Sequence, residues 1–117
     1  MEQNLIRHVF YYKNYYLDFY KRQTKDVQKK FNWTLELIEK IERVPKKYFD
    51  HITGTDGIWE VRIEVGGNIF RAFSFLYVGE QTVIANAFQK KSQKTPINEI
   101  ELAKKIKKEY FNEKSKK

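Results

Sequence analysis

Two arginines, Arg62 and Arg71, form the pattern in this sequence that points most clearly to chemistry. Apolar and polar residues alternate over 59–65, which is typical of a half-buried strand, and 69–78 is expected to return beside it. The glycines at 66–67 accept the positive φ angles that a two-residue hairpin turn needs. This turn sets the register and places Arg62 directly opposite Arg71 on one face of the hairpin.

Two cations at directly opposite strand positions repel each other, so the pair predicts an anion between them. A guanidinium fork matches the oxygens of a phosphate group, and the functional interpretation is therefore a phosphate clamp. The alternative is an ordinary surface network in which Glu60 and Glu64, the diagonal neighbours, neutralise both arginines. Either interpretation depends on the register, because a slip of one residue would turn these side chains to other faces.

A turn at Gly79-Glu80 and a strand over 81–89 complete a predicted three-strand meander, with Phe88 opposite Arg71. The aromatic rings beside the arginines could stack on nucleic-acid bases, and the alternative for each ring is core packing beneath a helix. In this register Phe73 lies opposite Asn86, and the face carries six residues: Glu60, Arg62, Arg71, Phe73, Asn86 and Phe88.

The meander runs directly into Lys90, Lys91 and Lys94, which are followed by Thr95 and Pro96. We expect Thr95 to cap a final helix and Pro96 to be its first residue. Lysines beside a helix N-terminus favour anions, because the free backbone N–H groups and the helix dipole attract negative charge. The pattern therefore extends the predicted anion site beyond the arginine pair.

Proton transfer has few candidates. His51, in the loop before the second strand, could act as a general base near neutral pH, although a lone loop histidine is more often a bystander. His8 is interpreted as structural. A lysine crowded by other cations can also act as an acid or base. In RNA cleavage the attacking 2′-hydroxyl belongs to the substrate, so the protein mainly positions the phosphate and stabilises its charge.

Composition narrows the class of protein. The chain has 117 residues and a formal charge of +8, and the segment 89–117 holds ten basic and four acidic side chains. This balance favours an anionic partner, nucleic acid first, although a solvated lysine-rich helix is the simpler alternative. Without cysteine and with two histidines, we expect neither a metal site nor another cofactor. We expect a cytoplasmic protein with no membrane partner, because no apolar run is long enough to span a bilayer.

The elements that must position these residues follow from periodicity. We expect a strand over 5–12 and a short helix over 15–23, then an amphipathic helix over 26–44 that ends before Pro45. The predicted fold class is α+β: a small antiparallel sheet of the N-terminal strand and the meander, packed by two N-terminal helices and a C-terminal one. The long helix has two apolar stripes, of which the second is Trp33, Leu37, Ile41 and Val44. We expect one domain over 1–111 and a flexible basic tail over 112–117.

Three sequence pieces also resemble a known family. They are G-T-D-G-x-W-E-x-R, G-G-N-x-x-R and F-x-K-K-x-x-K-T-P-x-x-E-I-x-x-A, and with the preceding helix the similarity covers about 27–110. The chain closely resembles the HigB-like, phage-derived branch of the RelE/ParE toxin superfamily. The resemblance implies a compact α+β fold and the toxin of a type II toxin–antitoxin pair, whose partner is usually a helix-turn-helix antitoxin.

By the same resemblance, the toxin enters the ribosomal A site and cleaves mRNA without a metal, through attack by the ribose 2′-hydroxyl. Arg62, Arg71, Lys90 and Lys91 fall on catalytic or phosphate-stabilising positions, and Glu60 is acidic where RelE itself is basic. No C-terminal Tyr or His matches the position that other members use for proton transfer or stacking. We assign RNA binding to Glu60, Phe73, Phe88, Lys94 and Thr95, and we expect an oligomeric complex with the antitoxin.

Two other functions remain open at this point. A ParE-like inhibitor of DNA gyrase would act by binding alone, and such inhibition does not need a phosphate clamp. A non-catalytic RNA- or DNA-binding module would use the same basic surface without cleaving its ligand. The basic hairpin face favours the ribosome-dependent endonuclease over both.

Overall fold

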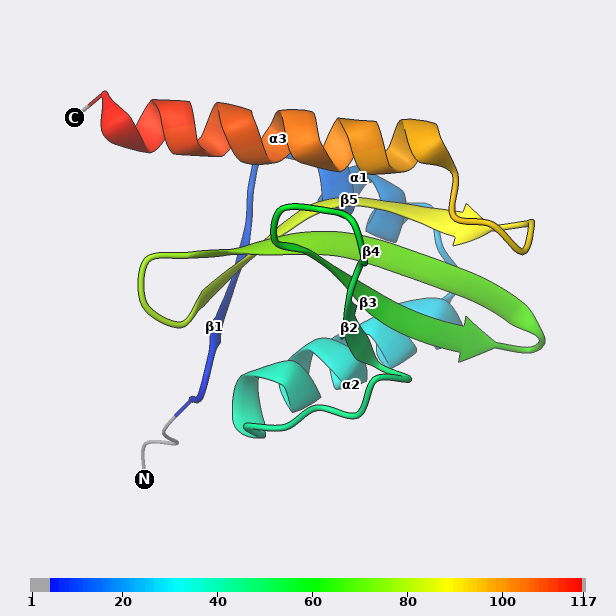
Figure 1. Ribbon diagram of the computed structural model, residues 1–117. Helices are drawn as coiled ribbons and strands as arrows, with labels where there is room; N and C mark the ends of the chain where they lie inside the picture. The colour runs from blue at the N-terminus through cyan, green and yellow to red at the C-terminus, as the bar shows by residue number, and fades with distance from the viewer. Residues whose placement is uncertain (1–4, 117) are drawn as a thin grey trace.

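The computed structural model describes residues 5–116 and confirms the α+β fold class. Within that range, three helices pack on a five-stranded mixed sheet of order β1-β5-β4-β3-β2. Figure 1 shows α3 on one face of the sheet and α2 on the other. The elements in chain order are β1 (His8–Tyr11), α1 (Tyr15–Lys21), α2 (Lys25–Lys40), β2 (Phe49–His51), β3 (Ile58–Val65), β4 (Asn68–Tyr77), β5 (Gln81–Lys90) and α3 (Ile97–Ser115).

The first hairpin has the predicted turn and register. Gly66 and Gly67 have φ angles of 57° and 81°, the left-handed conformations that a two-residue turn requires. Val65 therefore pairs with Asn68, and each earlier residue of β3 pairs with the expected residue of β4. The alternating pattern of β3 is enough to fix which side chains face each layer of helices.

The second hairpin differs from the prediction. Three residues, 78–80, connect β4 to β5, whereas the sequence predicts a two-residue turn at 79–80. Further along, a β-bulge places both Ala85 and Asn86 opposite Phe73, so the predicted one-to-one pairing of Phe73 with Asn86 is wrong. The extra bulge residue offsets the longer turn, and Phe88 lies opposite its predicted partner.

The outer strands correct the predicted antiparallel sheet. β1 is shorter than the predicted strand over 5–12, and it runs parallel to β5, with His8 opposite Gln81. The segment before the hairpin, expected to be loop, contains the short strand β2, antiparallel to β3. Strand direction at a sheet edge depends on where the chain returns after the helices, which local periodicity does not encode.

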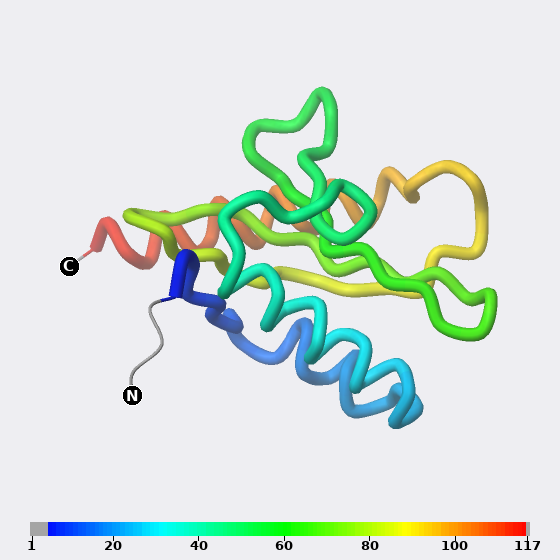
Figure 2. Tube along the Cα trace, turned by 90° about the horizontal axis from the view of Figure 1, so that it is seen from below, coloured from blue at the N-terminus to red at the C-terminus, as the bar shows by residue number. Residues whose placement is uncertain are grey.

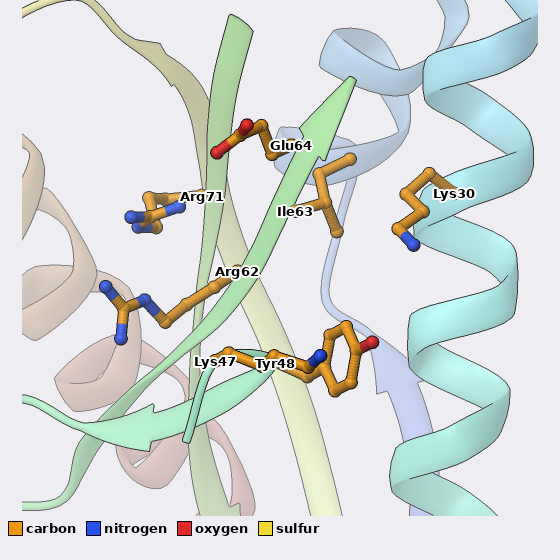
Figure 3. A pocket seen from close by; sticks show the side chains of 7 residues that line it. All are labelled: Lys30, Lys47, Tyr48, Arg62, Ile63, Glu64 and Arg71. Atoms are coloured by element: carbon orange, nitrogen blue, oxygen red, sulfur yellow. The ribbon is translucent and has the colours of Figure 1, made fainter. Parts of the chain in front are cut away.

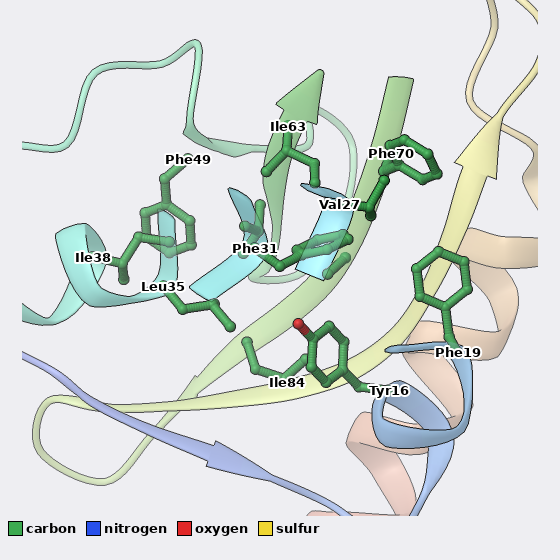
Figure 4. Close-up of a cluster of buried hydrophobic side chains, with 12 residues drawn as sticks. Tyr16, Phe19, Val27, Phe31, Leu35, Ile38, Phe49, Ile63, Phe70 and Ile84 are labelled. Carbon is green, nitrogen blue, oxygen red and sulfur yellow. The ribbon is translucent and has the colours of Figure 1, made fainter. Parts of the chain in front are cut away.

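The face that carries α1 and α2 holds a large aromatic core (Figure 4). Figure 2 shows these two helices side by side, and the rings of Phe19 and Phe31 meet edge to face between them. Thr24 caps α2 by accepting a hydrogen bond from Val27 N at 3.3 Å. The helix ends at Lys40, earlier than predicted, and Trp33 of the expected second stripe is 46% exposed.

The opposite face is covered by α3, which buries Ala103, Ile106 and Tyr110, whereas Ile97 at its start is 75% exposed. The N-cap of this helix is Pro96, which corrects the prediction that Thr95 caps it and that Pro96 is its first residue. The helix continues to Ser115, so most of the predicted tail over 112–117 is helical. Lys117 lies outside the described residues.

We predict that Phe73→Ala lowers the free energy of unfolding by about 3–5 kcal/mol, because the ring is fully buried beneath α3 and packs edge to face on Phe88. Phe10→Ala, at a 45% exposed ring on β1, is the control and should cost under about 1 kcal/mol. Urea denaturation of both variants measures the difference. Equal stability of the two variants would show that Phe73 is not a core residue.

Candidate functional site

The paired arginines share one carboxylate. Arg62 and Arg71 lie directly opposite each other in the β3–β4 ladder, and Figure 3 shows both side chains leaving the same side of the sheet. Glu60 Oε1 lies 3.3 Å from Arg62 Nε and 3.8 Å from Arg71 Nε. The neutralising network considered from the sequence is thus present in part: Glu60 forms the close contacts, and Glu64, which lines the same hollow, adds a more distant negative charge that raises the pKa of Arg71.

The pair keeps unused hydrogen-bonding capacity. Arg71 Nη1 donates to the Phe70 carbonyl oxygen at 3.1 Å, and Arg62 Nη1 donates to the Lys46 carbonyl oxygen at 3.3 Å. The Nε atoms of both arginines are buried and, among the described residues, have no hydrogen-bond partner of good geometry. Glu60 therefore balances charge without satisfying the donors, and an incoming anion with several oxygens could do both.

Burial makes Arg71 the more constrained member of the pair. The residue is 6% exposed, and burial lowers the pKa of its guanidinium, while the Glu60 carboxylate raises this pKa and the Arg62 charge lowers it. An arginine nevertheless stays protonated in proteins. A charged group held in a poorly hydrated place is a strong electrostatic partner for a phosphate, because little water competes with the contact.

A solvent-filled hollow of about 330 Å³ opens at this edge of the sheet. β2 pairs with only the first part of β3, so the later residues of β3 are not covered by a further strand. Side chains from α2 and from the segment before β2 surround the opening (Figure 3). The hollow is lined by Lys30, Lys47, Tyr48, Arg62, Ile63, Glu64 and Arg71.

The phenylalanines proposed for base stacking belong to the core. Phe73 is fully buried and Phe88 is 8% exposed, and both pack in the cluster beneath α3. Their rings meet edge to face with centroids 5.2 Å apart. The structure therefore corrects the interpretation of Phe73 as an RNA contact, because no face of its ring is open to a base. The same burial argues against stacking on Phe88.

Of the predicted lysines, one lies on the face of the sheet that carries the arginines. Lys90 ends β5 opposite Ile69 and, by strand alternation, lies on the same face as Phe88 and the arginines. Lys91, Lys94 and Thr95 lie in the connection 91–96, and the first two are exposed. The structure thus brings Lys90 to the arginine face and leaves the other three on the connection to α3.

The start of α3 is tied to the sheet through Asn86. Its Nδ2 donates to the carbonyl oxygen of Glu99 at 3.1 Å and to the Glu99 side chain at 2.9 Å. Asn86 is buried, and these bonds satisfy its Nδ2 donor, while its buried Oδ1 has no hydrogen-bond partner among the described residues. The tie fixes where α3 begins above the sheet, and hence where the connection 91–96 runs.

The two histidines lie away from the hollow. His51 is exposed on β2, opposite Trp59, and the two rings meet edge to face with centroids 5.4 Å apart. His8 begins β1. Neither lines the hollow around the arginines. The geometry therefore favours the bystander interpretation of His51.

Sequence reasoning missed three residues of the site: Lys30, Lys47 and Tyr48 line the hollow beside the arginines. Lys47 followed by Tyr48 was a local signal for a binding site, because it places a cation next to an aromatic ring, but both residues lie in a segment that the sequence predicts to be loop. Lys30 lies on the long helix next to a core position, and nothing in its spacing shows that it reaches β3. These residues meet the arginines only through tertiary packing.

The comparison with family models decides the relationship. Residues 18–108 match the model described as "Phage derived protein Gp49-like (DUF891)", which covers most of the chain, including both arginines. This chain belongs to the phage-derived Gp49-like family. The Gp49-like family is associated with RelE/HigB-like toxins, so the resemblance seen in the sequence is confirmed at that level. No curated protein gives a significant match to the chain.

Within residues 5–116, no cluster of three or more His, Cys, Asp or Glu side chains could hold a metal ion. In the same part of this Gp49-like chain, no helix combines the length and apolar character needed to cross a membrane.

We predict that Glu60→Gln lowers the free energy of unfolding by about 1–3 kcal/mol in a buffer without multivalent anions, because it leaves two neighbouring guanidinium groups uncompensated. Added phosphate should then raise the melting temperature of Glu60→Gln more than that of the wild type. Glu36→Gln, at an exposed carboxylate that pairs with Lys40, is the charge-matched control. An equal response of all three proteins to phosphate would contradict a phosphate site at the arginines.

Proposed function

We propose that this protein is the toxin of a type II toxin–antitoxin pair and cleaves mRNA on the ribosome. The observation that carries the proposal is the Arg62–Arg71 pair, which shares one carboxylate and borders an open hollow. Membership of the Gp49-like family supports the toxin role. The ribosome, the HigB-like branch and the cleavage reaction belong to the proposal.

In the proposed reaction the ribose 2′-oxygen attacks the adjacent phosphorus and the bond from phosphorus to the 5′-oxygen breaks. The proton leaves the 2′-hydroxyl, and the departing 5′-oxygen takes up a proton. Arg62 and Arg71 hold the two non-bridging oxygens and stabilise the charge that builds on them. Lys90 and Lys91 add positive charge from the β5 side, and ammonium groups there can donate a proton to the leaving oxygen.

The proposal also includes a partner and a location. We propose that the partner is a helix-turn-helix antitoxin, which forms an oligomeric complex with this toxin in the cytoplasm. The antitoxin would inhibit the toxin either by covering the arginine hollow or by keeping the toxin from the ribosome. An acidic or amphipathic segment of the antitoxin would fit the excess of positive charge around the hollow. Lys94 and Thr95, on the connection before α3, are proposed RNA contacts at the edge of the same surface.

We predict that Arg71→Ala and Arg62→Ala each reduce ribosome-dependent cleavage about 10²–10³-fold, because each removes a preorganised donor to the phosphate. Arg71→Lys should recover only part of the activity, since lysine keeps the charge but loses the fork. The measurement is primer extension on a message translated in a purified system, beside a thermal melt of every variant. Arg43→Ala is the control, because Arg43 lines a different hollow.

The cleavage assay, run beside a gyrase supercoiling assay and an RNA-binding assay, separates the competing functions. Cleavage that needs ribosomes supports the proposal, whereas inhibition of gyrase supercoiling without cleavage would replace it with a ParE-like activity. RNA binding without either effect would leave a non-catalytic module. Wild-type cleavage by a folded Arg71→Ala protein would remove the arginine clamp from the mechanism.

A further inference from the structure

An aromatic pair, the exposed Trp33 and the half-buried Tyr48, lies beside the arginine hollow. Trp33, on α2, is 46% exposed, and the ring of Tyr48 meets it edge to face with centroids 5.3 Å apart. Tyr48 comes from the segment that leads into β2, so the pair joins two elements that are distant in sequence. The exposed part of the indole, next to a second ring, offers a flat apolar surface with a polar edge to a ligand.

Two lysines lie over these rings. Lys30 Nζ is 4.6 Å from the Trp33 centroid and 5.7 Å from the Tyr48 centroid, and Lys47 Nζ is 5.0 Å from the Tyr48 centroid. Cation–π contacts of this kind hold the ammonium groups in place while leaving their N–H donors available. The cluster therefore offers flat rings and fixed positive charges within one small area.

The aromatic pair and the arginine pair border two neighbouring hollows at the open edge of β3. Lys30 and Glu64 line both the arginine hollow and a second, shallower one that reaches Trp33. Tyr48 is also tied directly to the arginine strand, because its carbonyl oxygen accepts a hydrogen bond from Arg62 N at 2.8 Å. Figure 3 shows the arginine side chains and Tyr48 on opposite sides of β3, so a ligand that contacts both pairs passes around the open edge of β3, where Glu64 lies.

We propose that Trp33 and Tyr48 form a stacking site for a base of single-stranded RNA whose neighbouring phosphate is held by Arg62 and Arg71. The inference deepens the proposed function and rests on it for the identity of the ligand. Alternating phosphate-binding cations and exposed rings are the chemistry that tracks a single strand, since every base has a face that can stack. Phe73 and Phe88 lie in the core, so this pair supplies the aromatic surface that RNA needs beside the clamp.

The test uses the fluorescence of Trp33. The chain has two tryptophans, so Trp59→Phe leaves Trp33 as the only one. The probe is a short RNA with 2′-O-methyl riboses, which lacks the attacking hydroxyl, compared with an abasic oligomer of equal length and charge. The RNA should quench Trp33 and bind at least about fivefold more tightly than the abasic oligomer, in keeping with the stacking free energy of one base.

Variants locate the effect on the aromatic pair. Trp33→Ala, made in the protein with Trp59 intact, and Tyr48→Ala should each weaken binding of the base-containing RNA about five- to a hundredfold and leave binding of the abasic oligomer nearly unchanged. Trp33→Phe should recover part of the loss. Phe10→Ala, at an equally exposed ring on β1, is the aromatic control. Lys40→Ala, on the same helix as Lys30, is the charge control for Lys30→Ala.

The outcomes separate this inference from the proposed function. Equal binding of the two oligomers, without quenching of Trp33, overturns the stacking site even if Arg71-dependent cleavage on ribosomes is intact. Quenching by base-containing RNA without any cleavage keeps the stacking site and removes the nuclease. If an acidic peptide binds with Trp33 quenching and RNA does not, the surface is a protein-docking site and the inference is wrong. The oligomer comparison alters neither ring of the pair, so it decides the question even if an alanine variant fails to fold.

Discussion

Two guanidinium groups held side by side on neighbouring strands repel each other, and the folded chain must offset that repulsion. It does so mainly with Glu60, whose carboxylate lies close to both Nε atoms without forming well-aligned hydrogen bonds to them, while Glu64 adds a more distant negative charge. The register that creates the pair is fixed by packing, because the alternate residues of β3 and β4 fill the core beneath α2. The hairpin cannot slip to relieve the repulsion without exposing those core residues. A phosphate between the arginines would supply the charge and the acceptors that Glu60 leaves incomplete.

The site is open to solvent because the edge strand β2 covers only part of β3. β2 pairs with β3 only over 59–61, and the hollow forms where that cover ends. Farther across the sheet, the bulge in β5 offsets the three-residue connection 78–80 and keeps Phe88 in line with the arginines. Asn86 lies at that bulge and binds the first turn of α3 through Glu99. The bulge in β5 thus sets both the alignment of Phe88 with the arginines and the start of α3. This agrees with the frequent use of bulges to aim side chains near functional sites.

Local sequence patterns predicted the elements whose causes are local. The period-two stretch of β3 and the two glycines after it determine a hairpin, and hence the opposition of Arg62 and Arg71. The long helix follows from its apolar spacing. Several failures depend on distant parts of the chain: the parallel direction of β1, the short strand β2, the bulge, and the exposure of Trp33. The role of Phe73 was ambiguous for the same reason. A ring beside the arginines can stack on a base or pack beneath a helix, and only the position of α3 decides between the two. Lys30 and Tyr48 joined the site only through tertiary packing. Two local predictions also failed, the two-residue turn at 79–80 and the Thr95 cap of α3.

The central claim is that Arg62 and Arg71 together bind a phosphate of single-stranded RNA. The most direct measurement is a two-dimensional ¹H–¹⁵N spectrum of the arginine side chains during titration with non-cleavable 2′-O-methyl RNA. The account predicts that the Nε–H signals of Arg62 and Arg71 shift together as the RNA replaces the Glu60 contact, while those of Arg22 and Arg43 stay in place. Raising the salt concentration should reverse the shifts, because phosphate contacts weaken steeply with salt. Signals of Arg62 and Arg71 that remain unmoved while RNA demonstrably binds elsewhere would contradict the account.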